Sequence, residues 1–151
     1  MDAIELLKGD HEKVSGIFEK LEPTTERAVK TREEMFTKLK QELDIHAHIE
    51  ETIFYPALKQ ALTDKQIVTH AYHEHQEVKD LLKQLESTPV DSEEWTTTLQ
   101  ELKESVEHHV EEEEDDMFEQ AREALTKQQM TDLGARMAEE KKNMQPQAAS
   151  A

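Results

Sequence analysis

The chain has 151 residues with 35 Asp and Glu against 18 Lys and Arg, a net charge of −17 that disfavours nucleic acids and anionic membranes as partners. It has no cysteine, which excludes disulfides, thiolate catalysis and cysteine-ligated zinc or iron–sulfur sites, so any metal must be held by nitrogen and oxygen. Only 3 Gly and 4 Pro, with 35% charged residues, predict a single all-α domain whose helices have charged outer faces.

The first predicted helix follows a capping signal. Asp2 and Glu5 have the spacing of an N-cap and its capping-box partner, and Pro23 closes the helix. One face carries apolar side chains at helical spacing together with one histidine: Ile4, Leu7, His11, Val14, Phe18 and Leu21.

The second predicted helix runs from about residue 26 to about residue 62 and carries an imidazole and a carboxylate on its buried face. Steps of three and four residues give the stripe Leu39, Leu43, His46, Glu50, Ile53 and Ala57. Pro56 should bend or break this helix just beyond the His46–Glu50 turn, because proline removes one backbone hydrogen bond.

Two further helices are predicted to follow. The third begins near Thr63 and Asp64, and its stripe again contains one histidine: Val68, Ala71, His75, Val78, Leu82 and Leu85. Asp91 and Glu94 are expected to cap the fourth, whose stripe contains a histidine and a carboxylate: Leu99, Leu102, Val106, His109, Glu113 and Met117.

A shorter fifth helix is predicted from about Thr126 to about Lys142, so we expect one helical domain over residues 1–142 and a disordered tail over residues 143–151. No apolar run approaches the roughly 20 residues of a membrane span, and the acidic amino terminus is unlike a secretory signal. We therefore expect a cytoplasmic protein.

The two halves of the chain repeat one design. The segment around His11 matches the segment around His75 at an offset of 64 (75 − 11), and His46-xxx-Glu50 matches His109-xxx-Glu113 at an offset of 63 (109 − 46). Spacing alone leaves other pairs open in the second half, namely His108 with Glu112 and His109 with Glu114. The repeat and the apolar stripe both select His109 and Glu113.

A buried carboxylate without a partner costs several kcal/mol, so Glu50 should be protonated, paired or bound to a cation. Four stripes that each contain a histidine, two of them with a carboxylate, favour a metal site. A metal-free bundle, in which the glutamates satisfy the inward histidines, is the competing interpretation. His48, His70, His73 and His108 fall off the stripes and are expected at the surface.

Two tyrosines are candidates for a role beside the metal. Tyr72 lies three residues before His75 on the flank of the same helical face, where packing is its expected role and ligation the alternative. Tyr55 lies nine residues from His46, half a turn out of phase on an ideal helix, but Pro56 could change that phase.

These residues resemble the hemerythrin-like HHE cation-binding family over residues 1 to about 125: Asp-His11, His46-xxx-Glu50 running into Phe54-Tyr55-Pro56, Glu-His75 and His-His109-xxx-Glu113. The resemblance implies an up-down-up-down four-helix bundle with a non-haem di-iron centre, expected to be oxo- or hydroxo-bridged. It implies as ligands His11, His46, Glu50, His75, His109 and Glu113. Mixed imidazole and carboxylate ligation suits iron, and manganese or zinc also fit.

The chain departs from the oxygen-carrying members of that family. They have a second histidine one turn before the position of His75, where this chain has Ala71, and a five-residue step to the last carboxylate. The symmetric four-histidine pattern leaves more coordination positions for water, peroxide, Tyr72 or Tyr55.

The function expected from this pattern is catalase-like consumption of hydrogen peroxide, or a reaction with dioxygen, by a di-iron oxidoreductase. The alternative is a protein that binds or senses oxygen, nitric oxide or iron without turnover. The expected partners are these small molecules, and neither nucleic acid nor membrane. No residue beyond the metal centre itself is assigned a catalytic role, with Tyr72 and Tyr55 as the only candidates.

Overall fold

The computed structural model describes residues 1–145, and every regular element within that range is helical. The elements are α1 (Ala3–Leu21), α2 (Val29–Ile49), η1 (Glu50–Phe54), α3 (Tyr55–Ala61), α4 (Gln66–Glu86), α5 (Glu93–Glu112), η2 (Glu113–Met117), α6 (Phe118–Ala124) and α7 (Lys127–Met144). The predicted all-α class is confirmed. Helix α7 extends two residues past its expected end, and residues 146–151 of the expected tail lie outside the described residues.

The helices begin mostly where the sequence indicates. Asp2 and Glu5 form the capping box predicted for α1. The N-cap of α5, however, is Ser92 and not Asp91, because the Ser92 hydroxyl accepts a hydrogen bond from the Trp95 amide at 3.2 Å.

The chain does not break at Pro56. Helices α2 and α3 are joined without interruption by η1, a π-helical turn in which the Tyr55 amide bonds to the Glu50 carbonyl five residues back. The same turn, η2, joins α5 to α6 through a bond from Phe118 to Glu113. Since the second turn contains no proline, Pro56 alone does not account for this geometry.

Each π turn changes the helical phase. A π turn accommodates one more residue than an α turn, so the buried stripe moves on by one position beyond Glu50. Leu58 is fully buried where the stripe predicted Ala57, which is only partly buried. Tyr55 follows the same shift and is also fully buried, so it faces the interior instead of lying half a turn away.

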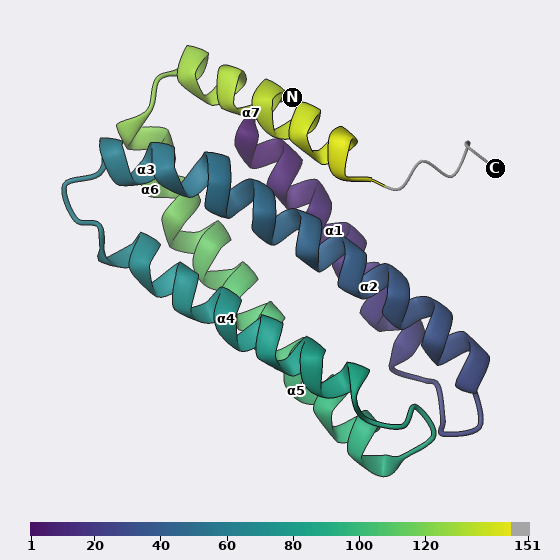
Figure 1. Ribbon diagram of the computed structural model, residues 1–151. Helices are drawn as coiled ribbons and strands as arrows, with labels where there is room; N and C mark the ends of the chain where they lie inside the picture. The colour runs from purple at the N-terminus through teal and green to yellow at the C-terminus, as the bar shows by residue number, and fades with distance from the viewer. Residues whose placement is uncertain (146–151) are drawn as a thin grey trace.

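Two helical hairpins make up the bundle (Figure 1). Helix α1 packs beside α2, and α4 packs beside α5, in the up-down-up-down arrangement that was expected. Helix α7 turns back across one end and lies against α1 and α2. Its Gly134 permits this close approach, because a Cβ there would clash with the backbone of Met1 and Asp2.

The apolar core is divided into two clusters, with the polar site between them. On α1, Leu7 belongs to one cluster and Val14 to the other, and His11 lies between these two residues. The first cluster joins the start of α1 to residues of α3, α4, α6 and α7 and of both π turns, and the second is built from the opposite ends of the four long helices. The site is therefore closed by packed side chains above and below.

A buried arginine joins the two loops at the far end of the bundle. Arg32 is 1% exposed and donates hydrogen bonds to Thr24, to the Val90 carbonyl and to Thr96, while its guanidinium lies 4.8 Å from the centre of the Trp95 ring. These contacts hold the loop after α1 against the loop after α4. The two hairpins are thus tied together away from the site.

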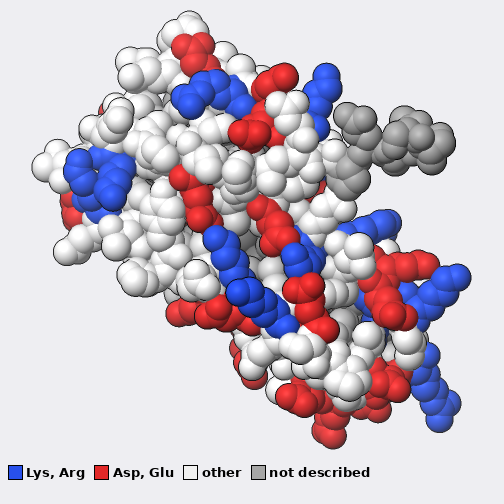
Figure 2. Space-filling view, in the orientation of Figure 1, with Lys and Arg blue, Asp and Glu red and all other residues white. Residues whose placement is uncertain are grey.

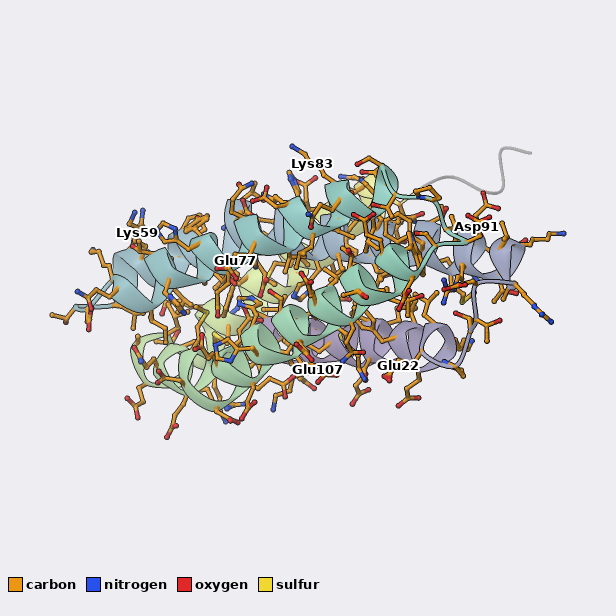
Figure 3. The ribbon with its side chains drawn as sticks, turned by 90° about the horizontal axis from the view of Figure 1, so that it is seen from below. Glu22, Lys59, Glu77, Lys83, Asp91 and Glu107 are labelled. Atoms are coloured by element: carbon orange, nitrogen blue, oxygen red, sulfur yellow. The ribbon has the colours of Figure 1, made fainter. Side chains whose placement is uncertain are left out.

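Many of the exposed side chains of the bundle are charged. Acidic and basic groups are interspersed over the face drawn in Figure 2. Lys59, Lys83 and Glu107 are exposed and point away from the helices in Figure 3. None of the helices in residues 1–145 is both long and apolar enough to cross a membrane.

Candidate metal centre

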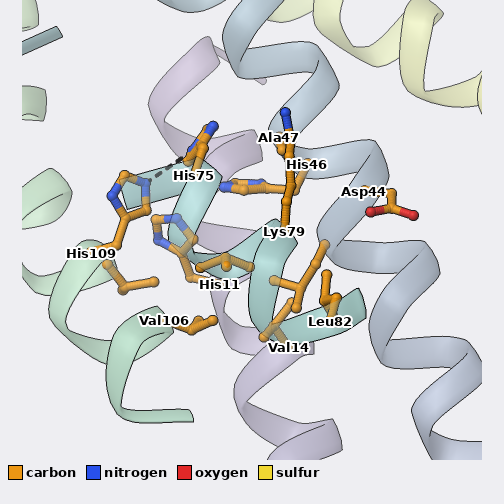
Figure 4. A pocket seen from close by; sticks show the side chains of 13 residues that line it. His11, Val14, Asp44, His46, Ala47, His75, Lys79, Leu82, Val106 and His109 are labelled. Carbon is orange, nitrogen blue, oxygen red and sulfur yellow. Dashed lines mark hydrogen bonds between the residues drawn. The ribbon is translucent and has the colours of Figure 1, made fainter. Parts of the chain in front are cut away.

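Four imidazoles from four helices meet in the middle of the bundle (Figure 4). His11 comes from α1, His46 from α2, His75 from α4 and His109 from α5. Their residues are only 5–7% exposed. The two carboxylates predicted with them, Glu50 and Glu113, are 0% and 1% exposed. The structure therefore brings all six predicted residues together.

The six side chains form two overlapping groups, each of which could hold a metal ion. Within each group the potential ligand atoms lie within 4.8 Å of one another. One group contains His11, His46, Glu50 and Glu113, and the other contains His75, His109 and the same two glutamates. The arrangement follows the repeat, because each pair of histidines comes from one hairpin.

Each glutamate reaches a histidine of both hairpins. Oε1 of Glu50 lies 3.2 Å from His46 Nε2 and 3.0 Å from His75 Nε2. Glu113 places Oε1 3.0 Å from His11 Nε2 and Oε2 3.2 Å from His109 Nε2. Atoms bound to one metal at about 2.0–2.2 Å are themselves about 3.0–3.6 Å apart, so these separations suit shared coordination.

A second set of carboxylates surrounds the histidines. Every Nδ1 lies within 3.0 Å of a carboxylate oxygen from a neighbouring helical run. The pairs are His11 with Glu114 (2.7 Å), His46 with Asp10 (3.0 Å), His75 with Glu51 (2.8 Å) and His109 with Glu74 (2.8 Å). Such outer carboxylates orient metal-binding imidazoles and increase their basicity.

These outer contacts determine which ring nitrogen faces the centre. A carboxylate can only accept a hydrogen bond, so Nδ1 carries the proton and a neutral imidazole presents its Nε2 lone pair inward. The Nε2 atoms of His75 and His109 are 3.2 Å apart, and in neutral rings both would be acceptors. The centre therefore needs positive charge from protons or from metal ions.

Several buried atoms have no hydrogen-bond partner among residues 1–145. These are Nε2 of His11 and His46, Oε2 of Glu50 and Oε1 of Glu113. His11 Nε2 and Glu113 Oε1 are close enough for an ion pair, but they are not aligned for a hydrogen bond, so proximity does not satisfy them. Unsatisfied buried nitrogen and oxygen atoms are what a metal ion would bind.

The electrostatics of the site also favour a cation. Burial lowers the pKa of His46, but the carboxylates of Glu50 and Asp10 outweigh burial and raise this pKa to about 10. Burial likewise opposes a charge on His109, yet bonds to Glu113 and Glu50 hold its pKa well above the usual range. The cluster without metal thus binds protons tightly, and metal ions would displace them.

Tyr55 adds a phenol to the second group. Its hydroxyl donates a hydrogen bond of 2.6 Å to Glu113 Oε2 and lies 3.2 and 3.3 Å from Nε2 of His75 and His109. Burial, with the charges of Glu50 and Glu113, raises the phenol pKa well above its usual range, so the hydroxyl keeps its proton.

The first group has no such hydroxyl. In the repeat, the residue after η2 is Phe118, which corresponds to Tyr55 after η1. The Phe118 ring stacks on the His11 imidazole with ring centres 6.0 Å apart. Tyr72, the other candidate, donates to the Glu51 carbonyl at 3.1 Å and packs edge-on against Tyr55. It does not reach the six-residue cluster.

The remaining histidines lie toward the surface. His70, His73 and His108 are exposed, and the side chain of His48 is 39% exposed. Glu114, the five-residue alternative to Glu113, bonds to His11 Nδ1 from outside the centre. The sequence repeat therefore selected Glu113, which lies in the buried cluster, over its neighbour Glu114, which lies outside it.

Sequence reasoning missed the roles of the outer carboxylates, although a signal was present. Asp10 and Glu74 directly precede His11 and His75, while Glu51 and Glu114 directly follow Glu50 and Glu113. Consecutive helical residues point about 100° apart, so a residue beside an inward ligand faces a neighbouring helix. The same two positions recur in both halves, and this recurrence separates them from the acidic background.

Comparisons with known proteins agree with this geometry. The family model for the hemerythrin HHE cation binding domain matches residues 2–121. An uncharacterised protein of Mycobacterium tuberculosis is 31% identical over 143 residues, covering 91% of this chain and 84% of the relative. A DNA nickase of Nostoc sp. is 26% identical over 129 residues, 85% of this chain, but the match spans only 36% of that relative.

A solved structure is also similar. It is the crystal structure of a hemerythrin HHE cation binding domain-containing protein from Mycobacterium kansasii, a homologue of the same M. tuberculosis protein. The two structures superpose with a TM-score of 0.84 at 30% identity, covering 95% of this chain and 87% of the other. The chain therefore belongs to the hemerythrin HHE cation-binding domain family.

Proposed function

We propose that this chain is a non-haem di-iron protein that consumes hydrogen peroxide in a catalase-like reaction. His11 and His46 would bind one iron and His75 and His109 the other, with Glu50 and Glu113 shared between them. The observation that carries this proposal is that both groups of ligand atoms contain the same two glutamates. Nitrogen and oxygen ligands suit iron, and they would also accept manganese or zinc.

Paired metal ions suit a two-electron reaction of a small substrate. A pair of irons held by the four histidines and the two glutamates would supply two-electron redox chemistry, which both halves of peroxide disproportionation need. The overall reaction converts two molecules of hydrogen peroxide into two of water and one of dioxygen. It needs no external reductant, and the chain must only admit peroxide, hold it and manage two protons.

A cavity of about 40 Å³ lies beside the four histidines and gives a small substrate room. Because a cavity needs about 10–15 Å³ of such volume to hold one water molecule, this cavity has room for only a few atoms. Its walls include Val14, Leu82 and Val106, and Asp44 and Lys79 are its charged residues (Figure 4). Apolar walls of this kind exclude bulky reductants and limit the water near the centre.

Tyr55 places a hydroxyl group at the centre. Its hydroxyl stays protonated and donates to Glu113 Oε2, so it supplies a fixed hydrogen bond there, and the carboxylates of Glu50 and Glu113 would carry protons to and from peroxide. The outer carboxylates keep the imidazoles in one tautomer while this happens. Glu50 and Glu113 would hold the two metal positions at a constant separation.

The alternative function is binding of dioxygen or nitric oxide without turnover. The small apolar cavity favours it, because such a cavity suits neutral diatomic molecules as well as peroxide. Dioxygen, nitric oxide and peroxide are the partners we propose, and neither nucleic acid nor membrane. The nickase activity named for the Nostoc relative belongs to that longer protein.

The test is to add hydrogen peroxide to the iron-loaded protein and follow peroxide loss, dioxygen release and the visible spectrum together. Catalase-like turnover predicts one dioxygen for every two peroxides over many cycles, with return of the starting spectrum. A persistent coloured adduct with no release of dioxygen would instead support the binding protein. His48→Ala is a matched control, because His48 lies two residues from His46 but outside the cluster.

A further inference from the structure

Two more HxxxE pairs lie on the outside of the second hairpin. His70 and Glu74 are one turn apart on α4, and His108 and Glu112 are one turn apart on α5. Helices α4 and α5 run side by side in opposite directions, so the two pairs meet (Figure 1). None of these residues belongs to the two groups in the buried centre.

The four side chains converge at distances that suit coordination. His70 Nε2 lies 3.4 Å from Glu74 Oε2 and 3.2 Å from Glu112 Oε2. His108 Nε2 lies 3.6 Å from the same Glu74 oxygen and 3.0 Å from Glu112 Oε1. Nitrogen and oxygen atoms around one tetrahedral metal ion are about 3.3–3.6 Å apart, so little rearrangement is needed.

Burial distinguishes this cluster from an ordinary patch of surface charge. The Glu74 side chain is only 9% exposed, and its other oxygen, Oε1, accepts a hydrogen bond from His109 Nδ1 at 2.8 Å. The imidazoles of His70 and His108 are 58% and 65% exposed. A buried carboxylate thus faces outward to two accessible imidazoles, which can turn toward an ion at little cost.

The repeat places a cation beside the residue that corresponds to Glu74. The matching residue in the first hairpin is Asp10, which accepts from His46 Nδ1 with one oxygen and from the Lys141 ammonium with the other. Within residues 1–145, no lysine or arginine pairs with Glu74, and its second oxygen faces the imidazoles. A metal ion would supply there the positive charge that Lys141 supplies to Asp10.

We propose that His70, Glu74, Glu112 and His108 form an outer site for one divalent transition-metal ion. His70, Glu74 and Glu112 offer three ligand atoms within 4.8 Å of one another, and His108 completes the set. Two imidazoles and two carboxylates suit Zn²⁺, Fe²⁺ or Co²⁺ better than Mg²⁺ or Ca²⁺, which prefer oxygen alone. Its ligand atoms are distinct from those of the buried centre, and Glu74 contacts the two sites through different oxygens.

The test is calorimetric titration with Zn²⁺, comparing the wild-type protein with a His70→Ala/His108→Ala variant. His73→Ala is the matched control, because His73 is exposed on α4 but is not part of the cluster. We expect the wild type and the control to bind one Zn²⁺ per chain more than the double variant. Equal numbers and affinities of Zn²⁺ in all three proteins would overturn the proposal.

Two further variants keep the result unambiguous. Glu112→Gln removes a charge from a half-exposed side chain, and it should weaken the outer site at least tenfold without changing the melting temperature in chelator. Unchanged Zn²⁺ affinity in this variant would also count against the site. His46→Ala should remove Zn²⁺ only from the buried centre. Loss of Zn²⁺ binding at the buried centre and loss of Zn²⁺ binding at the outer site are therefore measured in different variants.

Discussion

The Tyr55 hydroxyl donates a 2.6 Å hydrogen bond to Glu113 Oε2 across the two hairpins of the bundle. The contact joins the end of one π turn to the start of the other, although the residues are 58 positions apart in sequence. It gives one half of the proposed di-iron centre a hydrogen-bond donor, while the other half has the Phe118 ring in the corresponding position.

The first prediction concerns this phenol. Tyr55→Phe should keep both irons, because all six ligands remain, but it should lower peroxide turnover about tenfold or more, since the hydrogen bond that orients Glu113 is lost. Iron content and dioxygen release are measured on the same sample. Tyr72→Phe is the control and should leave turnover unchanged, because Tyr72 bonds only to the Glu51 carbonyl. Equal turnover in both variants would assign Tyr55 to packing alone.

The second prediction concerns the ligands. His46→Ala should lose at least the iron of its own hairpin, since it removes one ligand, leaves Asp10 without its imidazole partner and leaves Glu50 with His75 alone. Iron per folded chain is measured by elemental analysis after removal of free metal. His48→Ala should retain the wild-type iron content. Full iron content in His46→Ala would show that His46 is not a ligand.

The third prediction concerns pH. In the metal-free protein the pKa of His46 is raised to about 10, compared with about 6.5 in an unfolded chain. The stability that this gives is fully present below about pH 6.5 and is lost as the pH rises toward 10. Bound metal would replace the proton, so the iron-loaded protein keeps its stability over this range.

The melting temperatures of iron-loaded and chelated protein should therefore diverge between pH 6.5 and 9. Thermal unfolding followed by circular dichroism, with and without chelator, measures this difference. A difference that stays constant or narrows as the pH rises would contradict the proposed exchange of protons for metal.

The fourth prediction concerns the docking of α7. Gly134→Ala should destabilise the protein by about 1–3 kcal/mol, because the new methyl group overlaps the backbone of Met1 and Asp2. Gly16→Ala is the matched control in α1, where a Cβ meets no atom within 4 Å. It should stabilise the helix by about 0.5–1 kcal/mol. Denaturant unfolding of the two variants should shift in opposite directions, and parallel shifts would contradict the packing described.

Much of the site was predictable because it obeys two regular patterns. Helical periodicity placed His11, His46, His75 and His109 on buried stripes, and the repeat selected Glu113 from a run of six acidic residues. The structure brings these residues together with Glu50. The cost of burying charge explains why their presence on apolar stripes was informative.

The position of Tyr55 could not be predicted by the same means. The π turns Glu50–Phe54 and Glu113–Met117 share little sequence beyond their two glutamates, so nothing local indicates the extra residue. The contact of Lys141 with Asp10 could not be predicted from the sequence either, because it joins residues 131 positions apart and depends on the packing of α7 on α1. Such long-range contacts depend on tertiary packing and produce no periodic pattern in the amino-acid sequence.

The most direct measurement of the central claim is a crystal structure of the protein purified without chelator, with anomalous diffraction recorded on both sides of the iron absorption edge. The proposal predicts two iron peaks, one beside His11 and His46 and one beside His75 and His109, with Glu50 and Glu113 reaching both. A folded protein with no iron peak there, or with a single ion bound by only one hairpin, would contradict the shared di-iron centre.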